Sequence, residues 1–181
     1  MPDLSKAVSA LRSGGVIAYP TEAVFGLGCD PHDEAALARI IDIKSRDAHK
    51  GFILIAATQA QLSPFLAPIE PSWQTQFDAA WPGPVTFVVP ARQGISELLS
   101  GSRDTLAVRV SNHPLVQRLC EDFGGAIVST SANRSGQEPC RDTATATTLF
   151  GPQLDAIVQG QIGTLSAPTR IIDVRTGAQL R

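Results

Sequence analysis

The chain has 181 residues, of which 43% are hydrophobic and 18% charged, and its formal net charge is −2. Such a chain is typical of an ordinary globular protein, because at this length about two-thirds of the unfolded surface can be buried. The weak negative charge argues against a nucleic-acid coat protein, and no stretch is apolar for long enough to cross a membrane. We therefore expect a soluble, cytoplasmic protein with one domain over residues 1–181.

The hydrophobic pattern predicts helices and strands that alternate along the chain. Helical spacing of apolar residues predicts helices over residues 3–15, 33–46, 113–125 and 141–151, the second of them capped by Asp33. Short apolar runs predict strands over residues 16–20, 52–57, 85–91, 106–110, 126–131, 156–160 and 170–174. This order of elements predicts an α/β fold around a largely covered sheet.

The three cysteines and three histidines are scattered along the chain. No C-x-x-C pair occurs, so we expect reduced thiols rather than disulfides. The histidines have no spacing typical of metal ligands, and we expect no metal site built by the protein itself. The sequences G-x-x-x-x-G-K-[ST], G-x-G-x-x-G after a strand and G-x-S-x-G are also absent. Any phosphate site must therefore use another arrangement.

The stretch VIAYPTEAVFGLGCDP, residues 16–31, changes from an apolar strand to a polar segment with Thr21, Glu22, Gly26 and Gly28. Hydroxyl, carboxylate and glycine residues at a strand end are typical of a structural loop. They are equally typical of a site that holds a small polar ligand against the backbone. The residues alone leave both interpretations open.

Three cations lie close together between the helix at 33–46 and the next strand. Lys44 falls on the apolar face of that helix, beside Ile40, which is an unusual place for a cation unless the face borders a cleft. Lys44, Arg46 and Lys50 could together hold a triphosphate, with Arg46 binding in a bidentate manner. Alternatively, they form a solvated helix end in which cations complement the helix dipole. Taken alone, these residues favour the second interpretation.

Polar residues also follow the strand at 126–131, where ligands of α/β sheets gather beyond the carboxyl ends of strands. Ser129, Thr130, Ser131 and Asn133 supply hydrogen-bond donors and acceptors there, although taken alone they favour a structural turn. Arg109 interrupts an apolar strand. Because a buried arginine must be paired, either an anionic ligand or a structural carboxylate has to lie nearby.

These stretches, in this order, resemble the threonylcarbamoyl-AMP synthase family (the YrdC/Sua5 group), and within it the short bacterial form. The resemblance is carried by YPTEAVFGLGCDP, KSR followed by KGFILIAA, WPGPVTFVVPA, LAVRVSNHPLV, STSANRSG and PTRIIDVRTGAQLR. It covers almost the whole chain. It implies a single-domain α/β fold with an open, twisted, mixed sheet and flanking helices, in which the concave face of the sheet holds the site.

The resemblance also implies an activity, that of a nucleotidyltransferase. L-threonine is carboxylated with bicarbonate or CO2, and the carbamate attacks the α-phosphate of ATP, which carries Mg2+. The products are L-threonylcarbamoyladenylate and pyrophosphate, and the adenylate passes to threonylcarbamoyl transferase proteins that modify tRNA next to the anticodon. The alternative is a non-catalytic RNA-binding module, or weak RNA binding beside catalysis. The acidic balance and the few aromatic residues argue against the module.

Matching the family's motifs to this chain gives a set of expected site residues. Lys44 and Arg46, from the K-x-R motif, are expected to be catalytic and to bind ATP. The other residues expected at ATP are Lys50, Thr86, Ser131, Asn133, Arg141 and Arg181. The residues expected at threonine are Thr21, Arg109, Ser129 and Thr169.

Two positions are not settled by the resemblance. The K-x-R motif is commonly followed by proline, whereas Asp47 follows here and adds a negative charge beside the proposed phosphate site. Glu22 could meet the substrate ammonium or cap a turn, and the sequence does not separate these two roles.

Overall fold

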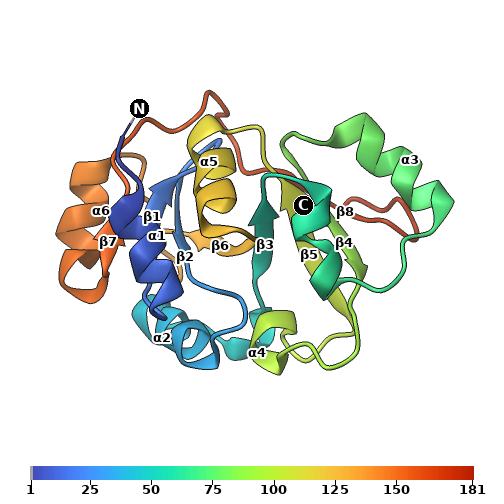
Figure 1. The fold of residues 1–181 in the computed structure, drawn as a ribbon, viewed down its shortest axis with the longest axis horizontal. Helices are drawn as coiled ribbons and strands as arrows, with labels where there is room; N and C mark the ends of the chain where they lie inside the picture. The colour runs from blue at the N-terminus through green and yellow to red at the C-terminus, as the bar shows by residue number, and fades with distance from the viewer. Residues whose placement is uncertain (1) are drawn as a thin grey trace.

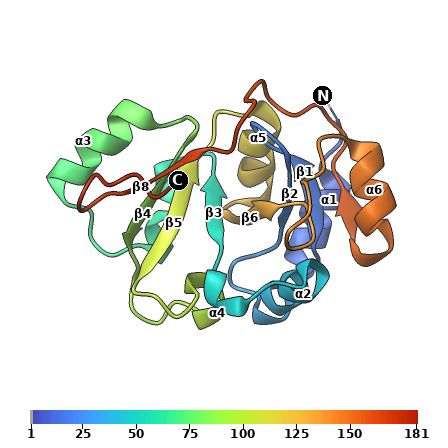
Figure 2. The same ribbon diagram turned by 180° about the vertical axis from the view of Figure 1, so that it is seen from behind.

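The computed structural model describes residues 2–181 as a mixed sheet with helices around it (Figures 1 and 2). The strands are β1 (Ile17–Pro20), β2 (Phe25–Gly28), β3 (Ile53–Ala56), β4 (Val85–Pro90), β5 (Thr105–Val110), β6 (Ile127–Ser131), β7 (Ala156–Ile157) and β8 (Arg170–Asp173). The α-helices are α1 (Ser5–Arg12), α2 (Glu34–Lys44), α3 (Pro71–Ala80), α4 (Glu97–Ser100), α5 (Pro114–Phe123) and α6 (Thr143–Phe150). The 3-10 helices are η1 (Ala48–Lys50), η2 (Gln59–Gln61), η3 (Ser63–Phe65) and η4 (Gly151–Gln153).

The eight strands form one sheet in the order β7-β1-β2-β6-β3-β5-β4-β8. The pairs β1–β7, β3–β5 and β4–β8 are parallel, and the other neighbours are antiparallel. In Figure 1, α5 lies in front of the middle of the sheet, with α6 at one end and α3 at the other. The expected α/β fold, an open mixed sheet with flanking helices, is confirmed.

Each predicted helix and strand is present, but the pattern missed α3, α4 and β2, the last of which was expected to be part of a polar segment. β2 has the sequence FGLG and is completely buried between β1 and β6. Glycine is required at Gly28, because a Cβ there would lie 2.5 Å from the main-chain oxygen of Val128 and 2.8 Å from the ring of Tyr19. Gly28 therefore serves strand packing.

Alternate residues of the central strands point to opposite faces of the sheet. Leu54, Val108 and Val128 belong to the larger of two hydrophobic clusters, together with residues of α2. Ile55 and Ile127 point the other way and pack in a second cluster with residues of α1 and α5. Burial on both faces explains why these strands read as continuous apolar runs.

The segment between the two edge strands, residues 158–169, crosses the whole sheet. β7 and β8 follow each other in the chain but lie at opposite edges, so this crossing segment runs along one side of the molecule between them (Figure 2). Main-chain bonds attach it to the β1 end of the sheet, from Val158 to Ala18 at 2.8 Å and from Gly163 to Thr21 at 2.9 Å. It thereby brings Thr169 against Arg109 of β5 and Thr86 of β4.

Candidate active site

A cavity of about 900 Å³ lies on the face of the sheet that α1 and α5 cover only in part. Its floor is made by alternate residues of three central strands, Ile53, Ala107, Arg109, Ser129 and Ser131. Around the floor stand the start of β2, the loop after α2, the end of the crossing segment, β8 and the chain end at Arg181. The volume is that of a site for a small-molecule ligand or cofactor.

Ten of the twelve residues expected at the site line this cavity. They are Thr21, Lys44, Arg46, Lys50, Arg109, Ser129, Ser131, Asn133, Thr169 and Arg181. Thr86 and Arg141 do not belong to its lining. Thr86 is fully buried beneath Thr169, with the two hydroxyl oxygens 3.4 Å apart, and Arg141 is exposed just before α6.

Lys44, at the end of α2, is a buried cation that holds the loop after β6. Its side chain is 4% exposed, and Nζ donates to the main-chain oxygens of Ser131 and Asn133, the latter at 2.8 Å. Nζ also lies 3.2 Å from Oδ1 of Asn133. Burial, and secondarily the charge of Arg46, lower the pKa of Lys44 to about 8. The expected position of Lys44 on the inner face of the helix is confirmed.

Arg46 is fixed in place by contacts from three directions. Nη1 donates to Oγ1 of Thr130 and Nη2 to the main-chain oxygen of Gly51, both at 2.8 Å. The guanidinium carbon lies 5.0 Å from the centre of the Phe52 ring. Because the guanidinium is held before any ligand arrives, it offers a preorganised positive charge to the cavity.

Sequence reasoning missed two cations of the lining, Arg175, which pairs with Asp173, and Arg103. Its Nη1 donates to the main-chain oxygen of His49 at 2.9 Å and its Nη2 to that of Lys50 at 2.7 Å. It therefore supports the loop that carries Lys50. Asp47 acts locally in the same loop, where its carboxylate accepts a bond of 2.9 Å from the main-chain nitrogen of His49 and caps η1.

The polar residues after β6 form a turn and line the cavity at the same time. Ser131 Oγ donates to Oδ1 of Asn133 at 2.6 Å. Asn133 Nδ2 donates to the main-chain oxygens of Arg134 and Gln137, at 3.0 and 2.8 Å. Both interpretations of these residues are therefore compatible, since turn chemistry holds the side chains that face the cavity.

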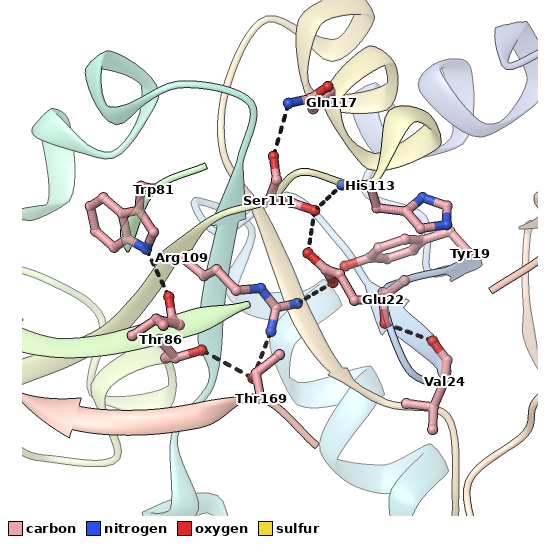
Figure 3. Close-up of polar contacts among 12 residues, drawn as sticks. Tyr19, Glu22, Val24, Trp81, Thr86, Arg109, Ser111, His113, Gln117 and Thr169 are labelled. Carbon is pink, nitrogen blue, oxygen red and sulfur yellow. Dashed lines mark hydrogen bonds and ion pairs between the residues drawn. The ribbon is translucent and has the colours of Figure 1, made fainter. Parts of the chain in front are cut away.

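Arg109 is 5% exposed and belongs to the floor of the cavity. Figure 3 shows its polar contacts. Its Nη2 pairs with Oε2 of Glu22 at 3.1 Å, and its Nη1 donates to Oγ1 of Thr169 at 2.8 Å. The carboxylate that a buried arginine requires is thus present. The carboxylate of Glu22 accepts from Arg109 and Ser111, and Glu22 is not part of the cavity lining.

Few acidic groups are available for a metal ion in this cavity. No group of three His, Cys, Asp or Glu side chains within residues 2–181 is arranged to hold a metal. The acidic residue of the lining is Asp173, which pairs with Arg175 at 3.0 Å. Across the described residues 2–181, no helix is both long enough and apolar enough to span a bilayer.

Comparisons with known proteins identify the family. The Sua5/YciO/YrdC family model, described as "Telomere recombination", matches residues 9–181. A threonylcarbamoyl-AMP synthase of Halorhodospira halophila is 51% identical over 175 residues, which cover 97% of this chain and 92% of that protein. The corresponding protein of Nitrosococcus oceani is 50% identical, over 97% of this chain and 95% of its own length.

Solved structures agree with this result. Sua5 of P. abyssi complexed with L-threonine superposes with a TM-score of 0.89 at 29% identity, over 96% of this chain and 51% of that chain. E. coli YciO gives a TM-score of 0.81 at 29% identity, over 95% of this chain and 86% of that chain. The chain therefore belongs to the Sua5/YciO/YrdC family, as its motifs indicated.

Proposed function

We propose that this protein is a threonylcarbamoyl-AMP synthase, which makes L-threonylcarbamoyladenylate and pyrophosphate from L-threonine, bicarbonate or CO2, and ATP. The name of the relatives that are about half identical to this chain supports the proposal. The observation that carries it is that one cavity holds two separate groups of cationic side chains. Arg109 lies buried on the floor, while Lys44, Arg46 and Lys50 stand together at the wall.

The two groups of cations suit the two substrates, the amino acid and ATP. The amino acid would lie over Arg109, near Thr21, Ser129 and Thr169, because an arginine matches the geometry of a carboxylate. The triphosphate would lie along the cations of the wall. The nucleotide would also contact the loop after β6 and the chain end, where Ser131, Asn133 and Arg181 line the cavity.

The chemistry needs charge neutralisation more than a base. The unprotonated threonine nitrogen attacks CO2 and loses a proton, which gives the carbamate. A carbamate oxygen then forms a bond to the α-phosphorus, and the bond from that phosphorus to the bridging oxygen of pyrophosphate breaks. Lys44 and Arg46 would neutralise the charge that develops on the phosphates.

Mg2+ fits this scheme as an ion carried by the substrate. It would supply positive charge on the triphosphate, and with so few carboxylates in the lining it would keep water and phosphate oxygens as ligands. The residues of this chain would bind and orient the nucleotide around it. We further propose that the reaction takes place in the cytoplasm and that the adenylate passes to proteins that transfer the threonylcarbamoyl group to tRNA.

The proposal is tested in an assay without RNA. The purified protein is incubated with ATP, Mg2+, L-threonine and 13C-labelled bicarbonate, and the products are analysed by mass spectrometry. We expect an adenylate whose mass increases with the label, together with pyrophosphate whose release depends on threonine. Tight RNA binding without threonine-dependent pyrophosphate would contradict the proposal and favour the RNA-binding module.

A further inference from the structure

The buried Arg109 guanidinium has a donor that no protein atom accepts. Within residues 2–181, its Nε is buried and lacks a hydrogen-bond partner, while Nη1 and Nη2 donate to Thr169 and Glu22. An unsatisfied buried donor is costly, and a donor of a charged group more so. Each Nη nitrogen carries a second N–H, and Arg109 lines the cavity, so an anionic ligand there would be met by the Nη groups.

Glu22 fixes the orientation of this guanidinium and is itself held by hydrogen bonds that donate toward its carboxylate (Figure 3). The main-chain nitrogen of His113 donates to Oγ of Ser111 at 3.0 Å. The hydroxyl of Ser111 therefore donates its own proton onward, to Oε1 of Glu22 at 2.6 Å. Oε2 of Glu22 accepts from Arg109, so both carboxylate oxygens act as acceptors.

The backbone of Glu22 is held as firmly as its side chain. The crossing segment, residues 158–169, passes directly over it. The main-chain nitrogen of Leu165 donates to the main-chain oxygen of Glu22 at 3.2 Å. A Cβ at Gly163 would lie 2.9 Å from the Glu22 Cα, so the segment approaches as closely as a glycine permits. Glu22 thus joins the crossing segment, the start of α5 and Arg109.

We propose that Glu22, supported by Ser111, is a positioning residue for recognition of the amino-acid carboxylate. It lies behind Arg109, outside the cavity lining, and fixes the direction in which the guanidinium of Arg109 faces the cavity. This inference rests on the proposed function, because it takes the amino acid as the ligand of Arg109. It goes further in assigning the orientation of this guanidinium to a residue that does not touch the substrate.

The variant Glu22→Gln distinguishes positioning of Arg109 from simple neutralisation of its charge. In Glu22→Gln one of the two oxygens becomes an NH2 group, which faces either the hydroxyl proton of Ser111 or the guanidinium of Arg109. If the NH2 faces Arg109, two donors meet and the guanidinium must shift; if it faces Ser111, the hydroxyl must turn to accept it, and Arg109 keeps only a neutral amide oxygen in place of the carboxylate. Small displacements of a binding group have large effects on a bound substrate.

The test compares two probes, L-threonine and L-threoninamide, which lacks the carboxylate charge. Binding of each probe and of ATP to the full chain is measured by calorimetry. We expect the wild type to prefer threonine by about tenfold or more, since the carboxylate bonds are charge-assisted. In Glu22→Gln this preference should fall toward unity while ATP affinity changes by less than about twofold. Ser111→Ala should lower the preference less, and in the same direction.

Several outcomes would overturn the inference. A preference that stays the same or increases in Glu22→Gln would mean that Glu22 only balances charge. Equal weakening of threonine and ATP would mean a general structural role. Glu121→Gln, an exposed carboxylate on α5, is the matched control and should behave as the wild type. If the wild type itself neither binds threonine nor forms the adenylate, the proposed function fails as well, so the two failures are distinguishable.

Discussion

Lys44 donates to both the main-chain oxygen and the side-chain oxygen of Asn133, at 2.8 and 3.2 Å, and so joins the end of α2 to the loop after β6. A residue expected to bind phosphate is therefore also a structural anchor of the loop expected to bind the nucleotide. These two contributions, charge and anchoring, can be measured separately.

Replacement of Lys44 by methionine should reduce both activity and stability. Turnover should fall about a hundredfold, as is typical when one electrostatic donor to the transition state is lost. The oxygens of Ser131 and Asn133 would lose their partner, which should cost about 1–3 kcal/mol in the free energy of unfolding. Pyrophosphate release and urea denaturation measure the two effects. Lys6→Met, on the exposed face of α1, is the control, and near-wild-type turnover of Lys44→Met would contradict the catalytic role.

Arg46→Lys should be far from conservative. A lysine cannot donate to Thr130 and Gly51 at once or lie flat against Phe52, so the charge would no longer be held in place. We expect kcat/KM for ATP to fall about tenfold or more, with a smaller effect on the KM for threonine. Arg92→Lys, at an exposed position, controls for the substitution itself. Unchanged ATP kinetics would show that Arg46 does not act on the nucleotide.

Local signals explain which parts of the fold could be predicted from the sequence. The helix α2 and its cap follow from apolar spacing and from Asp33, whose carboxylate accepts a bond of 2.9 Å from the main-chain nitrogen of Ala36. β2 and α3 lack such signals. β2 alternates glycine with apolar residues that are buried on both sides, and α3 is mostly polar and buries only Phe77 completely.

From the residues alone, the site was predictable where polar or charged residues stand at the end of a strand or helix or interrupt an apolar pattern. Ser131 and Asn133 carry that signal, whereas Arg103 reaches the cavity through contacts with residues more than fifty positions away. Thr86 is the opposite case. It shares a strand face with Val88, which lines the cavity, but the crossing segment places Thr169 over it. Such coverage depends on tertiary structure and leaves no pattern in the sequence.

Serine should be a poor substrate rather than an inert one. It differs from threonine by one methyl group, and a pocket gains only about 1–3 kcal/mol from a group of that size. Beside Thr21 the lining includes Ala23, Val24 and Phe25, which offer apolar contacts to the methyl group. We therefore expect kcat/KM to be about 10- to 200-fold lower for serine, measured as pyrophosphate release. Equal use of both amino acids would contradict threonine selection in this cavity.

Lys44 should make ATP affinity and stability respond to pH in opposite directions. Its pKa is about 8 in the folded protein, against an ordinary value of 10.5, because burial disfavours the ammonium. As the pH rises through about 8, the free protein loses this charge, so the affinity for the ATP triphosphate should decrease. Between pH 8 and 10.5 the unfolded chain binds more protons at Lys44 than the folded protein does. The contribution of this residue to the free energy of unfolding should therefore increase over the same interval.

The difference between the wild type and Lys44→Met isolates this titration from those of other groups. Calorimetric Kd values for ATP between pH 7 and pH 9.5 should converge for the two proteins as the pH rises, because the wild type loses the charge that the variant lacks. Urea denaturation over the same range should show the wild type gaining stability relative to the variant. Parallel curves in both measurements would mean that Lys44 does not titrate near pH 8. A bound triphosphate favours the ammonium, so kcat should retain its value to higher pH than kcat/KM for ATP.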